Sequence, residues 1–574
     1  MGKKVLIVGG VAGGASAAAR LRRLDEQAEI IMFERDGYIS FANCGLPYYI
    51  GETIRDRSRL LIQTPEAMKA RFNIDVRIYS EVTRVDTVNK IVTVSSKEKG
   101  TYQESYDTLV LSPGAKAIKP PIPGIDSSKI FALRNVHDTD SIKEVVGKKH
   151  AQSAIVIGGG FIGVEMAENL VQRGLRVSLV EAAPHILAPF DSDMVAIAEK
   201  ELVQNGIRLT VGDGVKAFED TQNTINVILA SGKVLTADFV ILAIGVAPDT
   251  AFLKDSGITL GPKGHIVVNE KMQTNVPDVY AVGDAIEVVD FITGQKAAVP
   301  LAGPANKQGR IAADNISGYP AAYKGTQGTS ILKVFGLTAA STGANERTLA
   351  KAGIAYKTVQ IHSASHASYY PGAAPMTLKL LFNEEGRVLG AQGMGRDGVD
   401  KRIDVIASVI RLKGTVNDLT ELELSYAPPF SSAKDPVNMV GFVAQNVLSG
   451  ISHLITWEDV SRMSDYILLD VRTNEEYKNG HVAGAINIPL DELREGLSSL
   501  DRNKTIIEYC QVGLRGHVAD RILSQNGFRV FNITGGYKSA VLMNIQMDEN
   551  RSSRNNPGGL ERVKADPDTQ AVKE

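Results

Sequence analysis

Short apolar runs alternate along the chain with segments of helical character. Lys3–Val8 is apolar, an alanine-rich stretch follows, and Glu29–Phe33 is apolar again. Short apolar runs that alternate with helices are typical of parallel strands buried on both faces of a sheet. Further runs of this kind are Thr108–Leu111, Ala154–Ile157, Val177–Val180, Phe239–Ile244 and Val279–Ala285. The pattern predicts an α/β fold.

A glycine-rich turn joins the first apolar run to the alanine-rich helix. Its glycines are Gly9, Gly10, Gly13 and Gly14. Glu34 ends the next strand, 25 residues after the first glycine, and Arg35 follows it. Such a βαβ unit suits a dinucleotide, with the pyrophosphate at the helix N-terminus and the ribose hydroxyls on the carboxylate. Val11 takes the place of the second glycine, so this copy of the fingerprint is imperfect.

A second fingerprint begins 149 residues after the first. It contains Gly158, Gly160 and Gly163, and Glu181 ends its second strand. Two dinucleotide sites imply two cofactors, such as a flavin and a nicotinamide that exchange hydride. Glu181 should bind a ribose 2′-hydroxyl and repel a 2′-phosphate, which favours NADH over NADPH, although NADPH stays possible.

Other apolar strands end in residues that allow a nucleotide to approach the backbone. These candidate cofactor contacts are Ser112, Gly114, Gly245 and Asp284.

Cys44 is one of only two cysteines in 574 residues. It lies in the stretch Ser40–Tyr48, where Asn43, Gly45 and Pro47 favour a turn followed by a helix start. The positive end of a helix lowers a thiol pKa, so we expect Cys44 to be a redox nucleophile.

The composition excludes several classes of protein. There are 63 basic and 65 acidic side chains, so no nucleic-acid or membrane surface is expected. Two cysteines cannot form a disulfide framework, and neither a signal peptide nor a run of membrane-spanning length is evident. We predict a soluble, cytoplasmic protein, and no metal site.

The two fingerprints, the Ala281–Ala285 stretch and the single cysteine of the first domain resemble the pyridine nucleotide-disulfide oxidoreductases. Residues 9–16 and 40–48 resemble the coenzyme A-disulfide reductase branch. The resemblance covers roughly residues 1–445 and implies the following domains: an FAD-binding domain at 1–149 and 270–325, an NAD(P)-binding domain at 150–269, and an α+β dimerisation domain at 326–445.

Two residues that related enzymes carry are missing here, and their absence restricts the reactions that we expect. Tyr49 stands where glutathione-reductase-like members carry a second cysteine, so the electrons must leave Cys44 through a bound thiol such as coenzyme A. The first glycine-rich turn lacks the histidine of the flavin NADH oxidases and peroxidases, which makes that activity the weaker alternative. A flavin-bound redox sensor is the alternative from another class.

Ser16, Arg20 and Arg23 fall on one face of the first predicted helix. Arginine suits the three phosphate groups of coenzyme A, although a solvated basic face has the same pattern. The resemblance implies that this face binds coenzyme A, and it adds Ser40, Asn43, Arg71 and, less securely, Lys434.

Two adjacent tyrosines, Tyr369 and Tyr370, precede a turn in the third domain. The resemblance places one of them, together with Tyr426, across a homodimer interface beside the cysteine sulfur. A phenol there could protonate a departing thiolate. The sequence does not decide between the pair, and we favour Tyr370.

After a linker at 446–454, residues 455–545 resemble the rhodanese fold, and a polar tail at 546–574 is predicted to be disordered. Cys510 opens a loop whose N–H groups can surround a thiolate or persulfide, and Arg515 can hold an anionic donor. Arg515 lies five positions after Cys510, rather than the six of the phosphatases that share this fold, which favours sulfur transfer. Whether this domain serves its own subunit, its neighbour, or only docking stays open.

The sequence therefore predicts an FAD-dependent NAD(P)H reductase of coenzyme A disulfide, coenzyme A persulfide or polysulfide, with a rhodanese domain that delivers sulfane sulfur.

Overall fold

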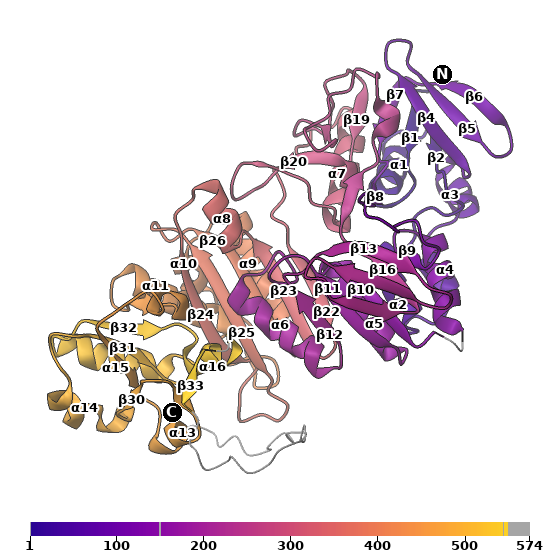
Figure 1. Cartoon of the computed structure of the whole chain (residues 1–574). Coiled ribbons are helices and arrows are strands. Elements are labelled where there is room, and N and C mark those ends of the chain that lie inside the picture. The colour runs from indigo at the N-terminus through magenta and orange to yellow at the C-terminus, as the bar shows by residue number, and fades with distance from the viewer. Residues whose placement is uncertain (1, 149–150, 544, 549–574) are drawn as a thin grey trace. The chain divides into compact units, whose positions relative to one another are not determined.

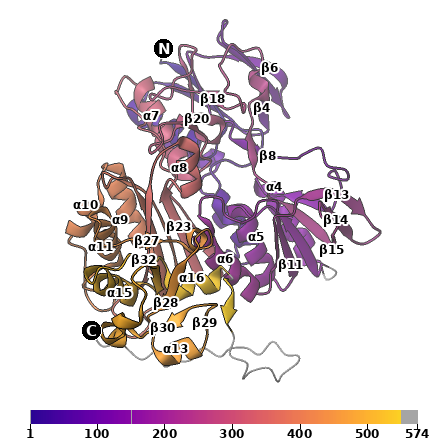
Figure 2. The same cartoon turned by 60° about the vertical axis from the view of Figure 1, so that its left-hand side comes forward.

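The computed structural model describes residues 2–148, 151–543 and 545–548, which form two compact units (Figures 1 and 2). The first contains residues up to 188 together with 202–328, and the second contains 189–201 and the described residues from 329 onward. From residue 549 onward the predicted tail lies outside the described residues. Within the described part, no helix is both long enough and apolar enough to cross a membrane.

Two five-stranded parallel sheets form the core of the first unit. The first sheet has the strand order β19 (Val279–Ala281), β7 (Thr108–Leu111), β1 (Lys4–Val8), β2 (Glu29–Phe33) and β3 (Asp75–Arg77). The second has the order β12 (Arg208–Val211), β11 (Arg176–Glu181), β10 (Ser153–Ile157), β16 (Phe239–Leu242) and β9 (Ile130–Ala132). Because the central strands are buried on both faces, they appear in the sequence as unbroken apolar runs, and the α/β prediction is confirmed.

Six helices belong wholly to this unit among the described residues. They are α1 (Ala12–Leu24), α2 (Leu46–Ile50), α3 (Pro65–Phe72), α4 (Val136–Gly147), α5 (Phe161–Gln172) and α7 (Ala302–Ile316). α1 packs along α7, and α2 packs against both α4 and α5 (Figure 1). The second packing matters for function, because α2 follows Cys44 directly while α5 is the helix of the second fingerprint.

Short strands complete the first unit. They are β4 (Ser80–Asp86), β5 (Ile91–Ser96), β6 (Gly100–Ser105), β8 (Ala115–Ala117), β13 (Val215–Asp220), β14 (Ile225–Leu229), β15 (Val234–Ala237), β17 (Val246–Pro248), β18 (Ile266–Val267), β20 (Ile286–Val289) and β21 (Lys296–Ala297). Two short strands pair across the predicted domain boundaries. β9 lies before residue 150 and joins the second sheet, and β18 lies before residue 270 and pairs with β20. Strands of two or three residues carry too little periodicity to be assigned from sequence.

Glycine is required where each fingerprint helix meets its strand. Gly9 and Gly158 have φ angles of 94° and 105°, a region that side chains disfavour. A Cβ on Gly14 would lie 1.9 Å from the Gly9 oxygen, and one on Gly163 would lie 1.9 Å from the Gly158 oxygen. Both helices therefore start in contact with the ends of their strands, which is where a pyrophosphate binds.

An antiparallel five-stranded sheet forms the dimerisation part of the second unit. Its order is β22 (Ser330–Val334), β23 (Leu337–Gly343), β26 (Val388–Gly395), β25 (Pro375–Phe382) and β24 (Lys357–Ala364). The helices are α8 (Glu346–Ala352), α9 (Val399–Arg411), α10 (Val416–Glu421) and α11 (Pro436–Leu448). α11 continues to Leu448, so the connection to the last domain begins later than the predicted linker.

The C-terminal domain is a parallel sheet between helices (Figure 2). Its order is β27 (Leu454–Ile455), β32 (Val530–Ile533), β31 (Thr505–Tyr509), β28 (Tyr466–Asp470) and β30 (Ile486–Asn487). The helices are α12 (Trp457–Val460), α13 (Asn474–Lys478), α14 (Leu493–Gly496), α15 (Leu514–Gln525) and α16 (Gly536–Leu542). β29 (His481–Val482) pairs with β33 (Met547–Asp548), so the domain extends to Asp548 and the predicted tail starts later than 546.

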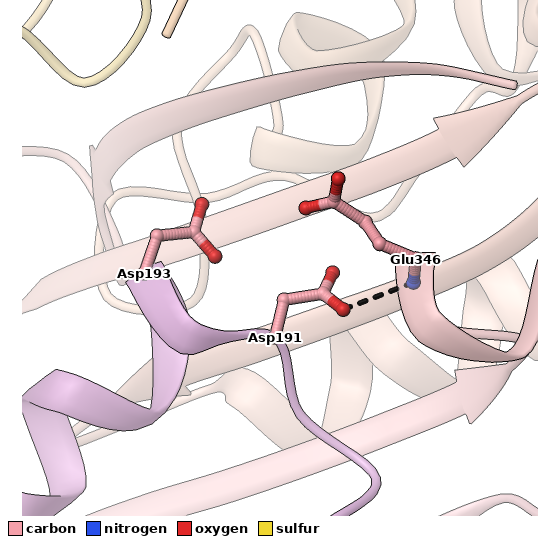
Figure 3. Close-up of side chains that lie close together, drawn as sticks. All are labelled: Asp191, Asp193 and Glu346. Atoms are coloured by element: carbon pink, nitrogen blue, oxygen red, sulfur yellow. Dashed lines mark hydrogen bonds between the residues drawn. The ribbon is translucent and has the colours of Figure 1, made fainter. Parts of the chain in front are cut away.

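A buried lysine holds three acidic side chains together in the second unit. Figure 3 shows Asp191, Asp193 and Glu346 facing one another, an arrangement that could hold a metal ion. Asp193 lies in the first turn of α6 (Ser192–Gln204), Asp191 just precedes that helix, and Glu346 starts α8. Lys379 of β25 is only 3% exposed; its Nζ lies 2.8 Å from Asp193 and 3.2 Å from Asp191, and it also bonds Glu346. The ammonium group therefore supplies the cation for this cluster.

We expect Lys379→Met to lower the free energy of unfolding by about 3–5 kcal/mol, because removing one partner from a buried ion pair leaves uncompensated charge. Urea denaturation, followed through the unfolding transition of the second unit, measures this decrease in the free energy of unfolding. The matched control is Lys351→Met on the exposed side of α8. Equal stability of the two variants would show that the cluster does not depend on the lysine.

Candidate functional site

A cavity of about 1620 Å³ lies at the carboxyl ends of the first parallel sheet. Ligands of open α/β sheets bind at this edge. The cavity brings together most of the residues predicted for the first cofactor and for coenzyme A: Gly9, Gly13, Glu34, Arg35, Ser112, Gly114, Asp284, Ser16, Arg20, Arg23, Ser40, Asn43 and Cys44. One cavity therefore contains the first fingerprint, the basic face of α1 and the first cysteine.

The first fingerprint is held by its own acidic residue. Glu34 accepts a hydrogen bond of 2.9 Å from the Gly10 amide, and burial raises the pKa of this carboxyl. Gly10 and Gly14 form the framework rather than the cavity wall. Arg35 pairs with Asp249 at 2.6 Å. These contacts fix the carboxylate at the place where the ribose of a bound dinucleotide would lie.

The second fingerprint repeats this arrangement. Glu181 accepts hydrogen bonds of 2.7 Å from the amides of Gly159 and Ala183. Gly160 is the N-cap of α5, and a Cβ there would meet only open space. Gly245 has a φ of 113° at the end of the neighbouring strand. The site therefore has the same local geometry as the first, at the ends of a second sheet.

Cys44 is exposed and lies in a single 3-10 turn, Asn43–Gly45, ahead of the five-residue helix α2. Partial burial of the thiol raises its pKa, and the charges of Glu165 and Asp284 raise it further, while Arg134 lowers it. The prediction that a helix N-terminus lowers this pKa is therefore wrong for the protein alone, because partial burial and two nearby carboxylates outweigh the effect of the short helix α2.

Glu165 is a residue of the site that the sequence did not reveal. It lies on α5, and it accepts a hydrogen bond of 3.2 Å from the Tyr48 hydroxyl. Burial raises the pKa of this carboxyl to about 7. Only the packing of α2 on α5 brings it to Cys44, since 121 residues separate the two in the sequence. Arg134, which donates a 2.7 Å hydrogen bond to Asp284, was missed for the same reason.

The basic face of α1 is partly neutralised by α7. Arg20 pairs with Asp314 at 2.7 Å, while Ser16 donates a hydrogen bond of 2.5 Å to Asn306. Arg23 has its guanidinium 6.0 Å from the centre of the Phe72 ring, and among the described residues no carboxylate lies within ion-pair distance of it. Asn306 and Arg310 also line the cavity, and their spacing of four residues on a helix was a signal that could have been found.

Two predicted coenzyme A contacts lie outside this cavity. Arg71 is exposed on α3, and Lys434 is exposed in the second unit, near the start of α11. Their predicted role stays a prediction.

The two adjacent tyrosines have different partners. The hydroxyls of Tyr369 and Tyr426 lie 2.8 Å apart, and both side chains are exposed. Tyr370 instead packs edge-on against His366, with ring centres 5.8 Å apart. Of the two adjacent tyrosines, Tyr369 is therefore the one that joins Tyr426, which differs from our preference for Tyr370.

Cys510 ends β31 and is buried, with its sulfur at the start of α15. The Gly513 amide donates a hydrogen bond of 3.0 Å to Sγ, and Gly513 has a φ of 125° that a side chain would disfavour. The Tyr537 amide donates to the Cys510 carbonyl at 2.8 Å. One backbone amide of the loop therefore points at the sulfur, and the role predicted for Cys510 stays a prediction.

Arg515 forms two hydrogen bonds with Glu476, at 2.6 and 2.7 Å. The guanidinium lowers the pKa of Glu476 to about 2. An anionic donor would have to compete with this carboxylate for Arg515.

The comparisons with known proteins agree with this geometry. Residues 3–309 match the pyridine nucleotide-disulphide oxidoreductases, residues 329–436 match the dimerisation domain of that family, and residues 456–541 match the rhodanese-like domain. The chain belongs to the pyridine nucleotide-disulphide oxidoreductase family and carries a rhodanese-like domain. Membership implies a flavin and a pyridine nucleotide as redox cofactors.

Three relatives are particularly informative. Coenzyme A disulfide reductase of Staphylococcus epidermidis is 39% identical over 445 residues, which are 77% of this chain and 100% of that protein. The crystal structure of reduced Bacillus anthracis CoADR-RHD has 51% identity and a TM-score of 0.93, covering 95% of this chain and 99% of the other. The NAD-dependent persulfide reductase from A. fulgidus has 36% identity and a TM-score of 0.88, covering 93% and 99%.

We expect Glu165→Gln to lower the pKa of the Cys44 thiol, because the ionised carboxylate disfavours a second negative charge beside it. In a Cys510→Ser background Cys44 is the only thiol, so alkylation of the holoprotein by iodoacetamide at different pH values reports its thiolate. The rate at pH 8 should rise about three- to tenfold, which corresponds to half to one pKa unit.

Glu144→Gln, which removes an exposed carboxylate from α4, is the control and should leave the profile unchanged. A Glu165→Gln profile that coincides with that of the control would mean that the carboxylate does not act on the sulfur.

Proposed function

We propose that this chain reduces coenzyme A disulfide and coenzyme A persulfide with NADH, through FAD and Cys44, and that Cys510 supplies sulfane sulfur. Reduction of the disulfide consumes one NADH and one proton and yields two coenzyme A thiols and NAD⁺. Reduction of the persulfide consumes the same reductants and yields one thiol and hydrogen sulfide. The observation that carries the proposal is the placement of Cys44, the first fingerprint and the basic face of α1 in one cavity.

The cavity fits FAD. A Cβ on Gly13 would lie 2.9 Å from the Val282 side chain and 3.0 Å from the Ser112 hydroxyl, so no side chain fits between this helix start and its neighbours. Glu34 would hold the ribose, and Gly13, Ser112 and Asp284 would line the remaining length. When bound, the flavin supplies two-electron reduction of a disulfide.

The second fingerprint fits NADH. Glu181 is fixed by two amides and would accept hydrogen bonds from the ribose hydroxyls, and its charge would repel the 2′-phosphate of NADPH.

Coenzyme A suits the rest of the cavity. Its phosphates need cations. Arg23 lines the wall with no carboxylate at ion-pair distance among the described residues, whereas Arg20 and Arg310 both lie beside Asp314, at 2.7 and 3.9 Å. Cys44 attacks the disulfide, one coenzyme A thiolate leaves, and the resulting mixed disulfide takes up the two electrons. The similarity to CoADR-RHD of B. anthracis and to the persulfide reductase of A. fulgidus supports this assignment.

Cys510 and the Tyr369–Tyr426 pair complete the proposal. The Cys510 thiolate, which accepts a hydrogen bond from the Gly513 amide, would take the sulfane sulfur of a donor such as thiosulfate and release sulfite. The resulting persulfide would then pass this sulfur to the thiolate of coenzyme A. A homodimer would bring the Tyr369–Tyr426 pair of one subunit to the other's Cys44, where a phenol can protonate the departing thiolate.

The deciding experiment compares Cys44→Ser with Cys510→Ser. Cys44→Ser should abolish NADH-dependent reduction of coenzyme A disulfide and persulfide while leaving thiosulfate sulfurtransferase activity. Cys510→Ser should retain the reduction of coenzyme A disulfide and lose sulfurtransferase activity, because each sulfur belongs to a different domain. Steady-state NADH oxidation is measured with coenzyme A disulfide, coenzyme A persulfide, polysulfide and peroxide side by side.

Each outcome has a distinct meaning. Loss of disulfide reduction in Cys510→Ser, with FAD content and folding unchanged, would contradict the division of labour between the cysteines. Rapid NADH oxidation with peroxide alone would favour an oxidase or peroxidase. Bound FAD with negligible turnover on all four substrates would favour a redox sensor.

We expect Arg23→Ala to raise KM for coenzyme A disulfide by about tenfold, the effect of losing one charge-assisted hydrogen bond to a phosphate. KM for inorganic polysulfide should stay within twofold, since polysulfide has no phosphate. Arg20→Ala should have the smaller effect, because Asp314 already neutralises Arg20. Lys254→Ala, an exposed charge outside the cavity, is the control. Equal effects on both substrates would show that Arg23 is only a solvated residue.

A further inference from the structure

A group of buried oxygen atoms without donors lies beneath the Cys510 loop. Glu508 and Asp520 are 0% exposed and Asn532 is 3% exposed. Among the described residues, no donor reaches either oxygen of Glu508, Oδ2 of Asp520 or Oδ1 of Asn532. A buried polar atom without a partner is destabilising, so four acceptors in one place need an explanation.

Three elements bring these side chains together. Glu508 on β31 and Asn532 on β32 are paired neighbours in the parallel sheet. Glu508 also shares its face with Cys510, two residues further along the chain. α15 covers this face, and Asp520 extends from it. The carboxyl group of Glu508 is thus enclosed between the strand that ends at the catalytic loop and the helix that begins there.

The space around these oxygens is full. A Cβ on Gly516 would lie 2.6 Å from Asn532 Oδ1 and 2.9 Å from Glu508 Oε2, so only glycine allows α15 to approach. A proton needs no volume, whereas an ion or a water molecule does. An un-ionised carboxylic acid supplies the missing donor, because it has one O–H group.

Glu508 is the acid that must hold this proton. Asp520 already accepts a hydrogen bond of 2.9 Å from the Ser524 hydroxyl, whereas Glu508 has no donor at all. The ionisable groups that face Glu508 are Cys510 on its own strand and Asp520 on α15, and β32 contributes only the neutral Asn532. Burial raises the pKa of Glu508 well above its usual range, and the charges of Cys510 and Asp520 act in the same direction.

We propose that Glu508 is a positioning residue for Cys510: as a neutral carboxylic acid it donates a hydrogen bond to Asn532 and so holds the Gly513 amide on the cysteine sulfur. Asn532 Nδ2 lies 3.5 Å from the Gly513 carbonyl oxygen, and the Gly513 amide donates to Sγ at 3.0 Å. A neutral acid also leaves the start of α15 free to stabilise the negative charge of the sulfur. The inference rests on the proposed role of Cys510 as the sulfur carrier.

The test uses the full-length holoprotein with Cys44→Ser, so that Cys510 is the only thiol. Iodoacetamide alkylation at different pH values reports the reactive thiolate and needs no sulfurtransferase activity, so it can fail independently of the proposed function. Glu508→Gln keeps a neutral side chain with an N–H donor, Glu508→Val removes the donor, and Glu495→Gln is a control at an exposed carboxylate of the same domain.

Glu508→Gln should keep the alkylation rate within twofold and leave the pH midpoint unchanged. Glu508→Val should slow alkylation at pH 7 by about tenfold, because Asn532 and Asp520 then compete with the sulfur for the loop amides. A midpoint that moves to lower pH in Glu508→Gln would show that an ionised carboxylate had been opposing the thiolate, and it would overturn the proposal. So would a Glu508→Val rate equal to that of the parent.

Infrared spectroscopy provides a readout that survives if Glu508→Val fails to fold. Glu165, with its pKa of about 7, contributes to the carbonyl stretch of un-ionised carboxylic acids at pH 7 in every variant. The parent should show an additional carboxylic acid band that disappears in Glu508→Gln and remains in Glu495→Gln. Identical carbonyl regions for the parent and Glu508→Gln would refute a proton on Glu508.

Discussion

The functional sites of this protein depend on how closely a helix start can approach the end of a strand. Gly14 and Gly163 each lie where a Cβ would be only 1.9 Å from a backbone oxygen of their own fingerprint. Only glycine permits that contact, and the contact aims the first amides of α1 and α5 at the ends of their sheets. The positions of Glu34 and Glu181 follow, because each carboxylate accepts a hydrogen bond from its fingerprint turn. In the C-terminal domain a glycine again permits a close contact, because a Cβ on Gly516 would lie 2.6 Å from Asn532 Oδ1 and 2.9 Å from Glu508 Oε2.

This constraint explains why the sequence was informative about the fold. Buried parallel strands must be apolar on both faces, so β2 and β7 have the bounds predicted from their apolar runs. The glycines that allow close approach are visible in the sequence as fingerprints. Short strands such as β9 and β18 form backbone hydrogen bonds without a periodic pattern, so the sequence did not reveal which sheet they join.

The site was predictable where a short motif marks its residues. Cys44, Asn43 and Ser40 share one stretch and one cavity. Glu165 lies near Cys44 through the packing of two helices, and no local pattern marks that contact. Which way Tyr369 and Tyr370 point on their turn is likewise not encoded in a local pattern, and the structure shows Tyr369 hydrogen-bonded to Tyr426.

The two cysteines lie in different surroundings. Cys510 is buried, and its sulfur accepts a hydrogen bond from the Gly513 amide. Cys44 is exposed, and carboxylates raise the pKa of its thiol. Coupling between charges is reciprocal, so a thiolate on Cys44 must raise the pKa of Glu165 as much as ionised Glu165 raises that of the thiol. Because Glu165 has a pKa of about 7, negative charge that forms on Cys44 near neutral pH favours proton uptake by this carboxyl. Charge at the Cys44 sulfur is therefore limited by a carboxyl group on α5, the helix of the second fingerprint.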